Sequence, residues 1–192
     1  MTSRGDMTDR DLLQAYVVQG DLECLGAFVE RHQGSLLRFA SRFLGDFEAA
    51  QDVVQETFLQ VSRNPKRLLG VENHHNWLLT VTRNLSISRI RRDSRARKHT
   101  AAFAERLAAS PAAEEEPAGK ALEDEELRSM VYREIHGLDR LQREVLLLKV
   151  EEKSYREIAA ITGLSVTYVG YLVYQAVKKL SMRLNHSRED FT

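Results

Sequence analysis

Two short helical patterns joined by a tight connection constrain this chain more than any other feature. Ser154 and Glu157 have the spacing of a capping box, which predicts the start of a helix over 155–162. Gly163 then supplies the left-handed residue at which helices commonly end, and Ser165 predicts the cap of a second helix directly after it. Two helices joined by so short a turn indicate a helix-turn-helix, whose second helix commonly enters the major groove of DNA.

Apolar residues recur at helical spacing around this turn and predict a three-helix unit. The positions expected inside it are Leu141, Val145, Leu146, Leu148, Ile158, Ala159, Ile161, Val169, Val173, Ala176 and Leu180. The positions expected to face outward on the second helix are Thr167, Tyr168, Gly170, Tyr171, Leu172, Tyr174 and Gln175, followed only in the last turns by Lys178, Lys179 and Arg183. Phosphate neutralisation supplies much of the affinity for DNA. A face without Lys or Arg in its first three turns therefore predicts either weak DNA contact, aided by a partner, or contact with a protein.

The 192 residues suffice for two small domains, and their charge is balanced overall but segregated along the chain. Lys plus Arg and Asp plus Glu each number 28, so the net charge does not indicate a nucleic-acid binder. Six basic residues against one acid lie within 89–98, whereas 105–126 is strongly acidic. We expect the basic run to contact the DNA backbone, with a solvated helix end as the alternative.

The single cysteine and the absence of long apolar runs indicate in which cellular compartment the chain is expected. Cys24 has no second cysteine with which to form an intrachain disulfide, and it lies on a predicted core face. No apolar run approaches the roughly 20 residues needed to span a bilayer. Residues 1–11 lack the apolar segment of a signal peptide. We therefore expect a reducing cytoplasm and no membrane insertion.

The rest of the pattern predicts an all-α fold of two small helical domains joined by a flexible linker. The expected domains are 1–99, a linker over 100–121 rich in Ala, Glu and Pro, and the helix-turn-helix domain over 122–192. Helices are expected to begin near Thr8, Asp21, Asp46, Trp77 and Leu122, with a loop over 66–76. The helix after Asp46 would turn Phe47, Ala50, Val53, Val54, Thr57, Phe58 and Val61 inward and Glu48, Gln51, Asp52, Gln55 and Glu56 outward.

Three segments in this order resemble a known family. Residues 45–59 read GDFEAAQDVVQETFL, residues 77–85 read WLLTVTRNL, and 141–148 with 155–159 read LQREVLLL and YREIA. They are similar, in turn, to the polymerase-binding helix, the promoter-melting helix and the domain reading the upstream promoter element in bacterial RNA polymerase sigma factors. The resemblance is to the extracytoplasmic-function type of the sigma-70 family, and it covers most of the chain.

The resemblance implies that the chain directs core RNA polymerase to specific promoters and helps to open the duplex, with no covalent chemistry, catalytic residue, cofactor or metal. The implied partners are core polymerase, promoter DNA and, as a further candidate, an anti-sigma factor. The implied polymerase-docking residues are Asp52, Gln55, Glu56, Phe58 and Leu59. Those implied for the downstream promoter element are Asn73, His74, His75, Asn76, Trp77, Arg83, Asn84, Arg89, Arg91, Arg92 and Arg95. Those implied for the upstream element are Ser165, Thr167, Tyr168, Tyr171, Gln175, Lys178 and Lys179.

His74 and His75 depart from the family, which usually shows an aromatic and then a basic residue there. The loop holding them would capture a base flipped from the nontemplate strand, a step that opening a duplex requires. Adjacent histidines with no nearby cysteine and no partner one helical turn away do not have the spacing of zinc ligands. We therefore expect base stacking or phosphate contact from them.

Two other functions stay open. A helix-turn-helix transcription regulator of the response-regulator kind would have alternating strands and helices and clustered aspartates in its amino half, which this sequence lacks. A sigma-like interaction module would use the aromatic face of Tyr168, Tyr171, Leu172 and Tyr174 to bind a protein. Tyrosines buried against a neighbouring helix are the alternative explanation of that face. The acidic linker is either a soluble tether or, as the resemblance implies, a mimic of a nucleic-acid strand in the polymerase.

Overall fold

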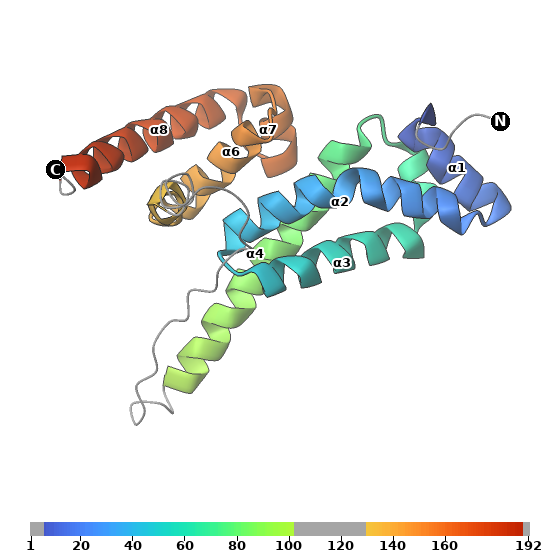
Figure 1. The fold of residues 1–192 in the computed structure, drawn as a ribbon, viewed down its shortest axis with the longest axis horizontal. Helices are drawn as coiled ribbons and strands as arrows, with labels where there is room; N and C mark the ends of the chain where they lie inside the picture. The colour runs from blue at the N-terminus through green and yellow to red at the C-terminus, as the bar shows by residue number, and fades with distance from the viewer. Residues whose placement is uncertain (1–5, 102–129, 190–192) are drawn as a thin grey trace. The chain divides into compact units, whose positions relative to one another are not determined.

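The computed structural model describes residues 6–101 and 130–189, and the regular elements in these ranges are all helices, as the sequence predicted (Figure 1). The chain divides into two compact units, one of Met1–Leu44 with Glu48–Ala112 and one of Gly45–Phe47 with Ala113–Thr192. Residues 100 and 101 of the expected linker belong to a helix. The rest of that linker, and the expected helix start near Leu122, lie outside the described residues.

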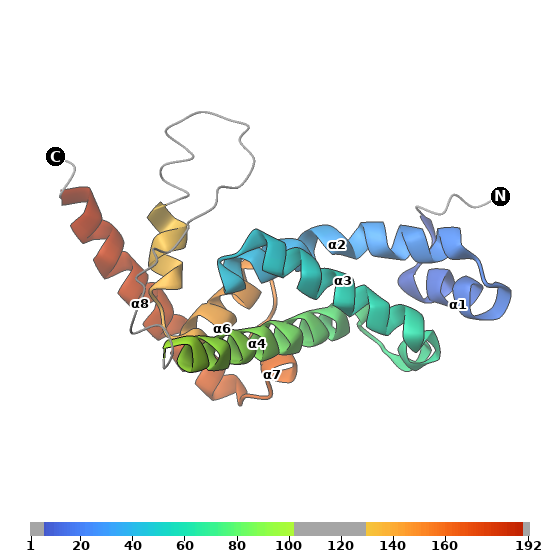
Figure 2. The same cartoon turned by 90° about the horizontal axis from the view of Figure 1, so that it is seen from below.

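Within the described residues, the first unit includes four α-helices and the 3-10 helix η2. They are α1 (Asp9–Gln19), α2 (Leu22–Leu44), α3 (Phe47–Arg63), η2 (Pro65–Gly70) and α4 (His74–Ala101). A capping box of Thr8 and Asp11 opens α1 at the helix start expected near Thr8, and Gly20 and Gly45 follow α1 and α2 in the left-handed region, at φ of +70° and +73°. α1 packs against α2 and η2, and α4 packs against α2. Figure 2 shows the long α4 running beneath α2 and α3.

The core of the first unit is formed by side chains of all its helices. Its largest fully buried side chains are Leu12, Leu13, Phe28, Leu36, Phe39, Phe43, Leu68, Leu78 and Leu79. Cys24 is buried, as expected. The hydroxyls of Thr57 on α3 and Thr82 on α4 meet inside this core at 3.1 Å, so the two helices share a buried hydrogen bond. Phe47, which was expected to face inward, is 39% exposed because it is the first residue of α3.

The second unit contains the predicted three-helix arrangement. Residues 130–136 are helical, followed by α6 (Arg140–Val150), α7 (Tyr155–Thr162) and α8 (Val166–Glu189), and α7 and α8 each pack against α6 and against each other. The capping box of Ser154 and Glu157 is formed, and Gly163 ends α7 at φ +76°. The expected helix-turn-helix is therefore present.

One residue of α8 lies on the opposite side from the one expected. Leu172 is only 5% exposed, although the sequence placed it on the outward face. Val169, Val173 and Ala176 are buried on the same helix. A helix that packs against two others buries a wider stripe than one packed against a single neighbour. α8 packs against both α6 and α7, so its buried stripe includes Leu172.

Within the part of the chain that the structure describes, no single helix has both the length and the apolar composition needed to cross a membrane. Tyr155–Thr162 and Val166–Leu184 meet that test only as a pair, which is bent by 103°.

Candidate polymerase and promoter interfaces

A polar stripe reaches the surface along α3. Asp52 and Gln55 are exposed, Glu56 and Phe58 are half-buried, and Leu59 is 40% exposed. The inner side of the same helix is buried through Ala49, Ala50, Val53, Val54, Thr57 and Val61. Because the core holds one side of α3, the stripe on the other side is presented on a rigid element. We call Asp52, Gln55, Glu56, Phe58 and Leu59 the α3 stripe.

Both acidic members of the α3 stripe pair with arginines. Asp52 Oδ2 lies 3.1 Å from Arg89 Nη1, and Arg89 Nε lies 3.4 Å from Asp93 Oδ2. The hydrogen bond with Asp52 raises the pKa of Arg89 above its usual value. Glu56 Oε1 lies 2.9 Å from Arg63 Nη1. Exposed pairs of this kind contribute little to stability, but the first one joins a residue expected to bind polymerase with a residue expected to bind DNA.

The segment before Trp77 is mostly helical, which corrects the expected loop over 66–76. Residues 65–70 form η2 and α4 begins at His74, so only residues 71–73 are irregular. Asn73 is exposed and caps α4, since its Oδ1 accepts a hydrogen bond from the backbone N–H of Asn76 at 2.9 Å. Asn76 and Trp77 are half-buried in the first turn of that helix.

His74 faces the interior, contrary to the expectation that it contacts DNA. Its ring is 7% exposed, and its Nε2 donates to the carbonyl oxygen of Leu68 at 3.0 Å. The edge of Phe28 completes its surroundings, with ring centroids 6.1 Å apart. A ring so enclosed has no face to offer a base. His75 is half-buried and stacks on His32 at a centroid distance of 5.4 Å, so its ring is also turned toward α2.

A small open hollow lies beside Trp77. Its lining residues are Gln60, Arg63, Asn64, Arg67 and Trp77. A half-buried indole flanked by two guanidinium groups can stack on an unpaired base and contact its phosphate. Of these five residues, only Trp77 was predicted from the sequence to contact DNA. Asn64-Pro65 could have indicated that the other residues lie together. Proline favours the first turn of a helix, and a helix that starts at Pro65 brings Arg67 back toward the end of α3.

The second half of α4 presents the predicted basic surface. Arg91, Arg92 and Arg95 are exposed, and Arg89 is half-buried against Asp52. Nearer the start of the helix, Asn84 is exposed and its Oδ1 accepts a hydrogen bond from the half-buried Arg83 at 3.0 Å. Arginines grouped on one exposed helix attract a phosphate backbone without reading its sequence.

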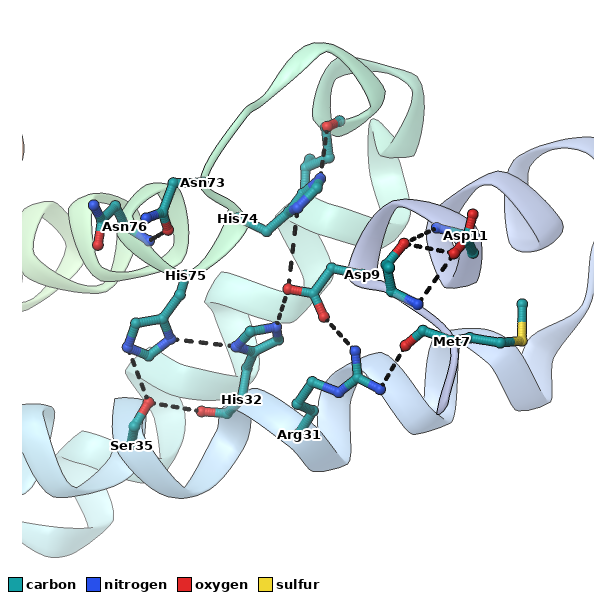
Figure 3. Close-up of polar contacts among 12 residues, drawn as sticks. Met7, Asp9, Asp11, Arg31, His32, Ser35, Asn73, His74, His75 and Asn76 are labelled. Atoms are coloured by element: carbon teal, nitrogen blue, oxygen red, sulfur yellow. Dashed lines mark hydrogen bonds and ion pairs between the residues drawn. The ribbon is translucent and has the colours of Figure 1, made fainter. Parts of the chain in front are cut away.

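A chain of polar contacts that the sequence did not predict joins α1, α2 and α4 (Figure 3). Asp9 Oδ2 lies 2.8 Å from His32 Nε2, and His32 Nδ1 lies 3.2 Å from His75 Nδ1. Asp9 Oδ1 accepts from Arg31 Nη1 at 2.8 Å. Partial burial raises the pKa of Asp9, but the hydrogen bonds and charges of His32 and Arg31 outweigh it and lower the pKa to about 2. Over 6–101 and 130–189, no group of three or more His, Cys, Asp or Glu side chains is arranged to hold a metal ion.

The recognition helix α8 exposes its tyrosines. Tyr168, Tyr171 and Tyr174 are 42%, 55% and 62% exposed, so the explanation that they are buried against a neighbouring helix is wrong. Tyr168 and Tyr171 stack on each other, with centroids 6.1 Å apart and planes within 12°. Ser165 caps the helix, because its Oγ accepts from the backbone N–H of Tyr168 at 3.2 Å. Thr167 is exposed beside them.

Some polar side chains near the basic end of the same face interact with other residues of the second unit. Lys178 is exposed, whereas Lys179 Nζ lies 2.8 Å from Asp139 Oδ2 and 2.9 Å from Gln142 Oε1. Gln175 is half-buried. Gly170, which was expected to face outward, is half-buried, and a β-carbon added there would meet the ring of Tyr155 at 3.6 Å. Tyr155 therefore covers part of the face that a DNA groove would meet.

Comparison with known families accounts for both units. The family model for sigma-70 region 2 matches residues 28–96, and the model for sigma-70 region 4 matches residues 128–180. The ECF RNA polymerase sigma factor EcfG of Rhodopseudomonas palustris (strain TIE-1) is 34% identical in an alignment of 162 positions, which covers 82% of this chain and 83% of EcfG. The probable ECF RNA polymerase sigma factor SigI of Mycobacterium tuberculosis (strain H37Rv) is 27% identical over 78% of this chain. The match covers only 52% of SigI, so the chain spans about half the length of that relative.

The fold has a counterpart among solved structures. The sigma factor RpoE of Bartonella quintana, solved in complex with the anti-sigma factor NepR, superposes with a TM-score of 0.65 at 22% identity. That superposition covers 89% of this chain and 98% of RpoE. The two matched regions and the similarity to EcfG define the family. The chain belongs to the extracytoplasmic-function group of the sigma-70 family of bacterial RNA polymerase sigma factors.

Proposed function

We propose that this chain binds core RNA polymerase, directs it to specific promoters and helps to open the duplex there. It acts by binding alone, without covalent chemistry, a cofactor or a metal, and its place of action is the cytoplasm. The observation that carries the proposal is that one compact unit holds the α3 stripe, the hollow at Trp77 and the arginines of α4 together. Each of these three features fits one of the three tasks.

The α3 stripe is the proposed polymerase-docking surface. It combines exposed polar groups with the apolar edge of Leu59, a composition typical of interface surfaces. Reversing the charge of Asp52 would also disturb Arg89, so that substitution does not isolate docking. Gln55→Lys and Leu59→Lys avoid the ion pairs of the stripe. Gln33→Lys, at an exposed position of α2, adds the same charge elsewhere and is the matched control.

The docking test is a direct affinity measurement with purified core polymerase. We expect Gln55→Lys with Leu59→Lys to weaken binding at least about tenfold, which corresponds to roughly 1.4 kcal/mol. The Gln33→Lys control should bind as the parent does. The assignment of the stripe is wrong if the double variant binds as tightly as the parent while its helix content and unfolding midpoint are unchanged.

The hollow at Trp77 is the proposed site for an unpaired base of the opened strand. Trp77 supplies a stacking surface, and Arg67 on η2 supplies a cation at the rim. His74 is left out of this proposal because it is buried, and His75 because it stacks on His32. Arg67→Gln removes one charge from the hollow. Lys66→Gln removes one charge from a neighbouring exposed position that does not line it.

Permanganate reactivity of promoter thymines measures opening, and it can be compared with recruitment on the same DNA. We expect Arg67→Gln to reduce thymine reactivity more than it reduces polymerase recruitment, because an unpaired base is held only after melting. Lys66→Gln should affect the two measurements equally. If both variants open the promoter as the parent does, the hollow is not part of the opening machinery.

The arginines of α4 are the proposed contact to the promoter backbone. Replacing Arg91, Arg92 and Arg95 by Ala should weaken DNA binding across sequences and lower the salt slope by roughly one unit per lost phosphate contact. Titrating DNA affinity of the polymerase complex against salt measures both effects. An unchanged salt slope would show that these arginines do not contact DNA phosphates.

The exposed tyrosine face of α8 is proposed to meet the upstream promoter element, with an anti-sigma factor as the competing occupant of the same surface. Tyrosines carry aromatic area with a polar tip and are common in protein interfaces. The few cations of this face, chiefly Lys178, predict that its share of DNA affinity is small. Tyr171→Ala and Tyr174→Ala should therefore weaken binding to an inhibitory protein more than they weaken promoter binding by the polymerase complex.

A further inference from the structure

The two walls of the hollow at Trp77 come from separate elements that residues 71–73 connect. Arg67 lies on η2, and Trp77 lies in the first turn of α4. Three irregular residues do not by themselves fix the distance between two helices. The shape of the hollow therefore depends on side chains that tie the start of α4 to the elements around it.

One such tie runs from α4 directly to η2. His74 Nε2 donates to the carbonyl oxygen of Leu68 at 3.0 Å, one residue beyond Arg67 along the chain. His74 Nδ1 lies 4.0 Å from Asp9 Oδ2. The hydrogen bond is buried, so it is shielded from competition by water.

A second tie runs from the next residue of α4 to α2 and α1 (Figure 3). His75 Nδ1 lies 3.2 Å from His32 Nδ1, and His32 Nε2 lies 2.8 Å from Asp9 Oδ2. On the far side of its ring, His75 Nε2 lies 3.5 Å from Ser35 Oγ. Arg31 holds the outer end, since its Nη1 donates to Asp9 at 2.8 Å and its Nη2 to the carbonyl oxygen of Met7 at 2.8 Å.

The carboxylate of Asp9 orients the histidine rings in this second set of contacts. An ionised carboxylate only accepts hydrogen bonds, so His32 donates to Asp9 through Nε2. His32 Nδ1 then faces His75 Nδ1: it accepts from His75 when His32 is neutral and donates to His75 when His32 is protonated. In both cases Asp9 fixes the orientation of the His32 ring, and the contact between the two Nδ1 atoms fixes that of His75, as a carboxylate orients a histidine in many functional sites.

Apolar side chains at these positions would stabilise the fold at least as well as the polar contacts do. Phe28, whose ring lies 4.8 Å from His32, already supplies apolar packing here. Burying histidine and carboxylate groups requires every partner to be satisfied, whereas apolar side chains need no partner. What the polar chain adds is directional geometry, because hydrogen bonds fix angles that apolar contacts leave free.

We propose that Asp9, His32 and His75 are positioning residues for promoter opening: they set the start of α4, and with it the distance between Trp77 and Arg67 across the hollow. The proposal rests on the proposed function, in which the hollow holds an unpaired base. It assigns these residues no contact with DNA. Their effect is on the opening step, because the hollow holds a base only after melting, whereas the α3 stripe and the arginines of α4 act in recruitment.

Paired substitutions at His75 separate positioning from mere stability. The amide of His75→Asn places a donor where Nδ1 lies and keeps the contact with His32. The amide of His75→Gln reaches the position of Nε2, toward Ser35, and loses that contact. Both variants remove the imidazole and leave a polar side chain of similar size. Arg31→Gln is a third variant that loosens Asp9 from the surface and leaves the buried residues in place.

The experiment uses the full chain with core polymerase on a promoter fragment that the parent chain opens. Closed-complex affinity and the rate at which thymines become permanganate-reactive are measured below the unfolding midpoint of each variant, read from Trp77 fluorescence. We expect His75→Gln to open the promoter about fivefold to tenfold more slowly than His75→Asn, with closed-complex affinities equal within about twofold. Arg31→Gln should slow opening about twofold to threefold.

Two results would overturn the proposal. The first is equal opening rates for His75→Gln and His75→Asn together with a normal rate for Arg31→Gln. The second is a loss of recruitment in parallel with opening, which marks a role in stability alone. A parent chain that binds no polymerase or opens no promoter would instead contradict the proposed function, so the two failures are distinguishable.

Discussion

Replacing Asp9 with Asn gives a change in stability whose size and pH dependence follow from the structure. Asp9 carries a pKa of about 2 in the folded chain against 3.8 for the unperturbed group. One pKa unit corresponds to about 1.36 kcal/mol, so the shift alone is worth a little over 2 kcal/mol. The carboxylate is partly exposed, with 21% of its side chain accessible, and solvent screening reduces this value. We expect a loss of about 1–2 kcal/mol in the free energy of unfolding of the first unit at about pH 7.

The sign of the pH dependence distinguishes this cause from lost packing. Because folding depresses the pKa of Asp9, its contribution is complete above 3.8 and disappears as the pH falls toward about 2. The difference between parent and Asp9→Asn should therefore shrink steadily across this window. Loss of packing would instead produce a difference that is independent of pH.

Trp77 makes the measurement specific to the first unit. It is the single tryptophan of the chain and lies half-buried in α4, so its fluorescence follows the unfolding of that unit in urea. Glu30→Gln, at an exposed position of α2, removes the same charge and serves as the control. Two results would contradict a stabilising role of the Asp9 charge: identical unfolding curves for Asp9→Asn and Glu30→Gln at neutral pH, or a deficit of Asp9→Asn that persists unchanged down to about pH 2.

Three further predictions concern single contacts. Asp52→Asn and Arg89→Gln, combined in a double-mutant cycle of polymerase–promoter binding, should show a coupling below about 1 kcal/mol, because the pair is exposed; a larger value would mean that the pair is buried in the complex. Thr57→Val should lower the unfolding midpoint in urea and cost about 1–2 kcal/mol, since it leaves the buried hydroxyl of Thr82 without this partner, and adding Thr82→Val should recover part of the loss. Ser154→Ala should cost the second unit about 1 kcal/mol by removing the capping box, measured by thermal unfolding followed by circular dichroism, and an unchanged midpoint would deny the cap a stabilising role.

Much of the helical framework was predictable because its signals are local. The capping boxes at Thr8 and Ser154 involve residues three apart, and Gly163 ends a helix through its own backbone. Helical spacing of apolar residues identified most of the buried side of α3 for the same reason. The roles expected of the segments came from the family resemblance, because spacing alone does not indicate them.

The misplaced residues depend on contacts between distant parts of the chain. His32 lies 23 residues from Asp9 and 43 residues from His75, and nothing within its own helical turn indicates that partnership. His74 looked exposed because residues 66–76 were expected to form a loop, whereas η2 curls back and offers the carbonyl of Leu68 to its ring. Leu172 was expected to face outward because spacing within one helix does not show how many neighbours that helix has. α8 packs against both α6 and α7, so its buried stripe is wide enough to include Leu172.

Mapping of RNA 5′ ends in a reconstituted system tests the central claim most directly. Purified chain is added to core RNA polymerase with genomic DNA from the source organism, and the 5′ ends are compared with those made by core polymerase alone. We predict a small set of new start sites that share two sequence elements upstream, with thymines near each start becoming reactive to permanganate. Start sites identical to those of core polymerase alone, at a chain concentration that saturates binding to polymerase, would contradict the assignment of promoter selection and opening to this chain.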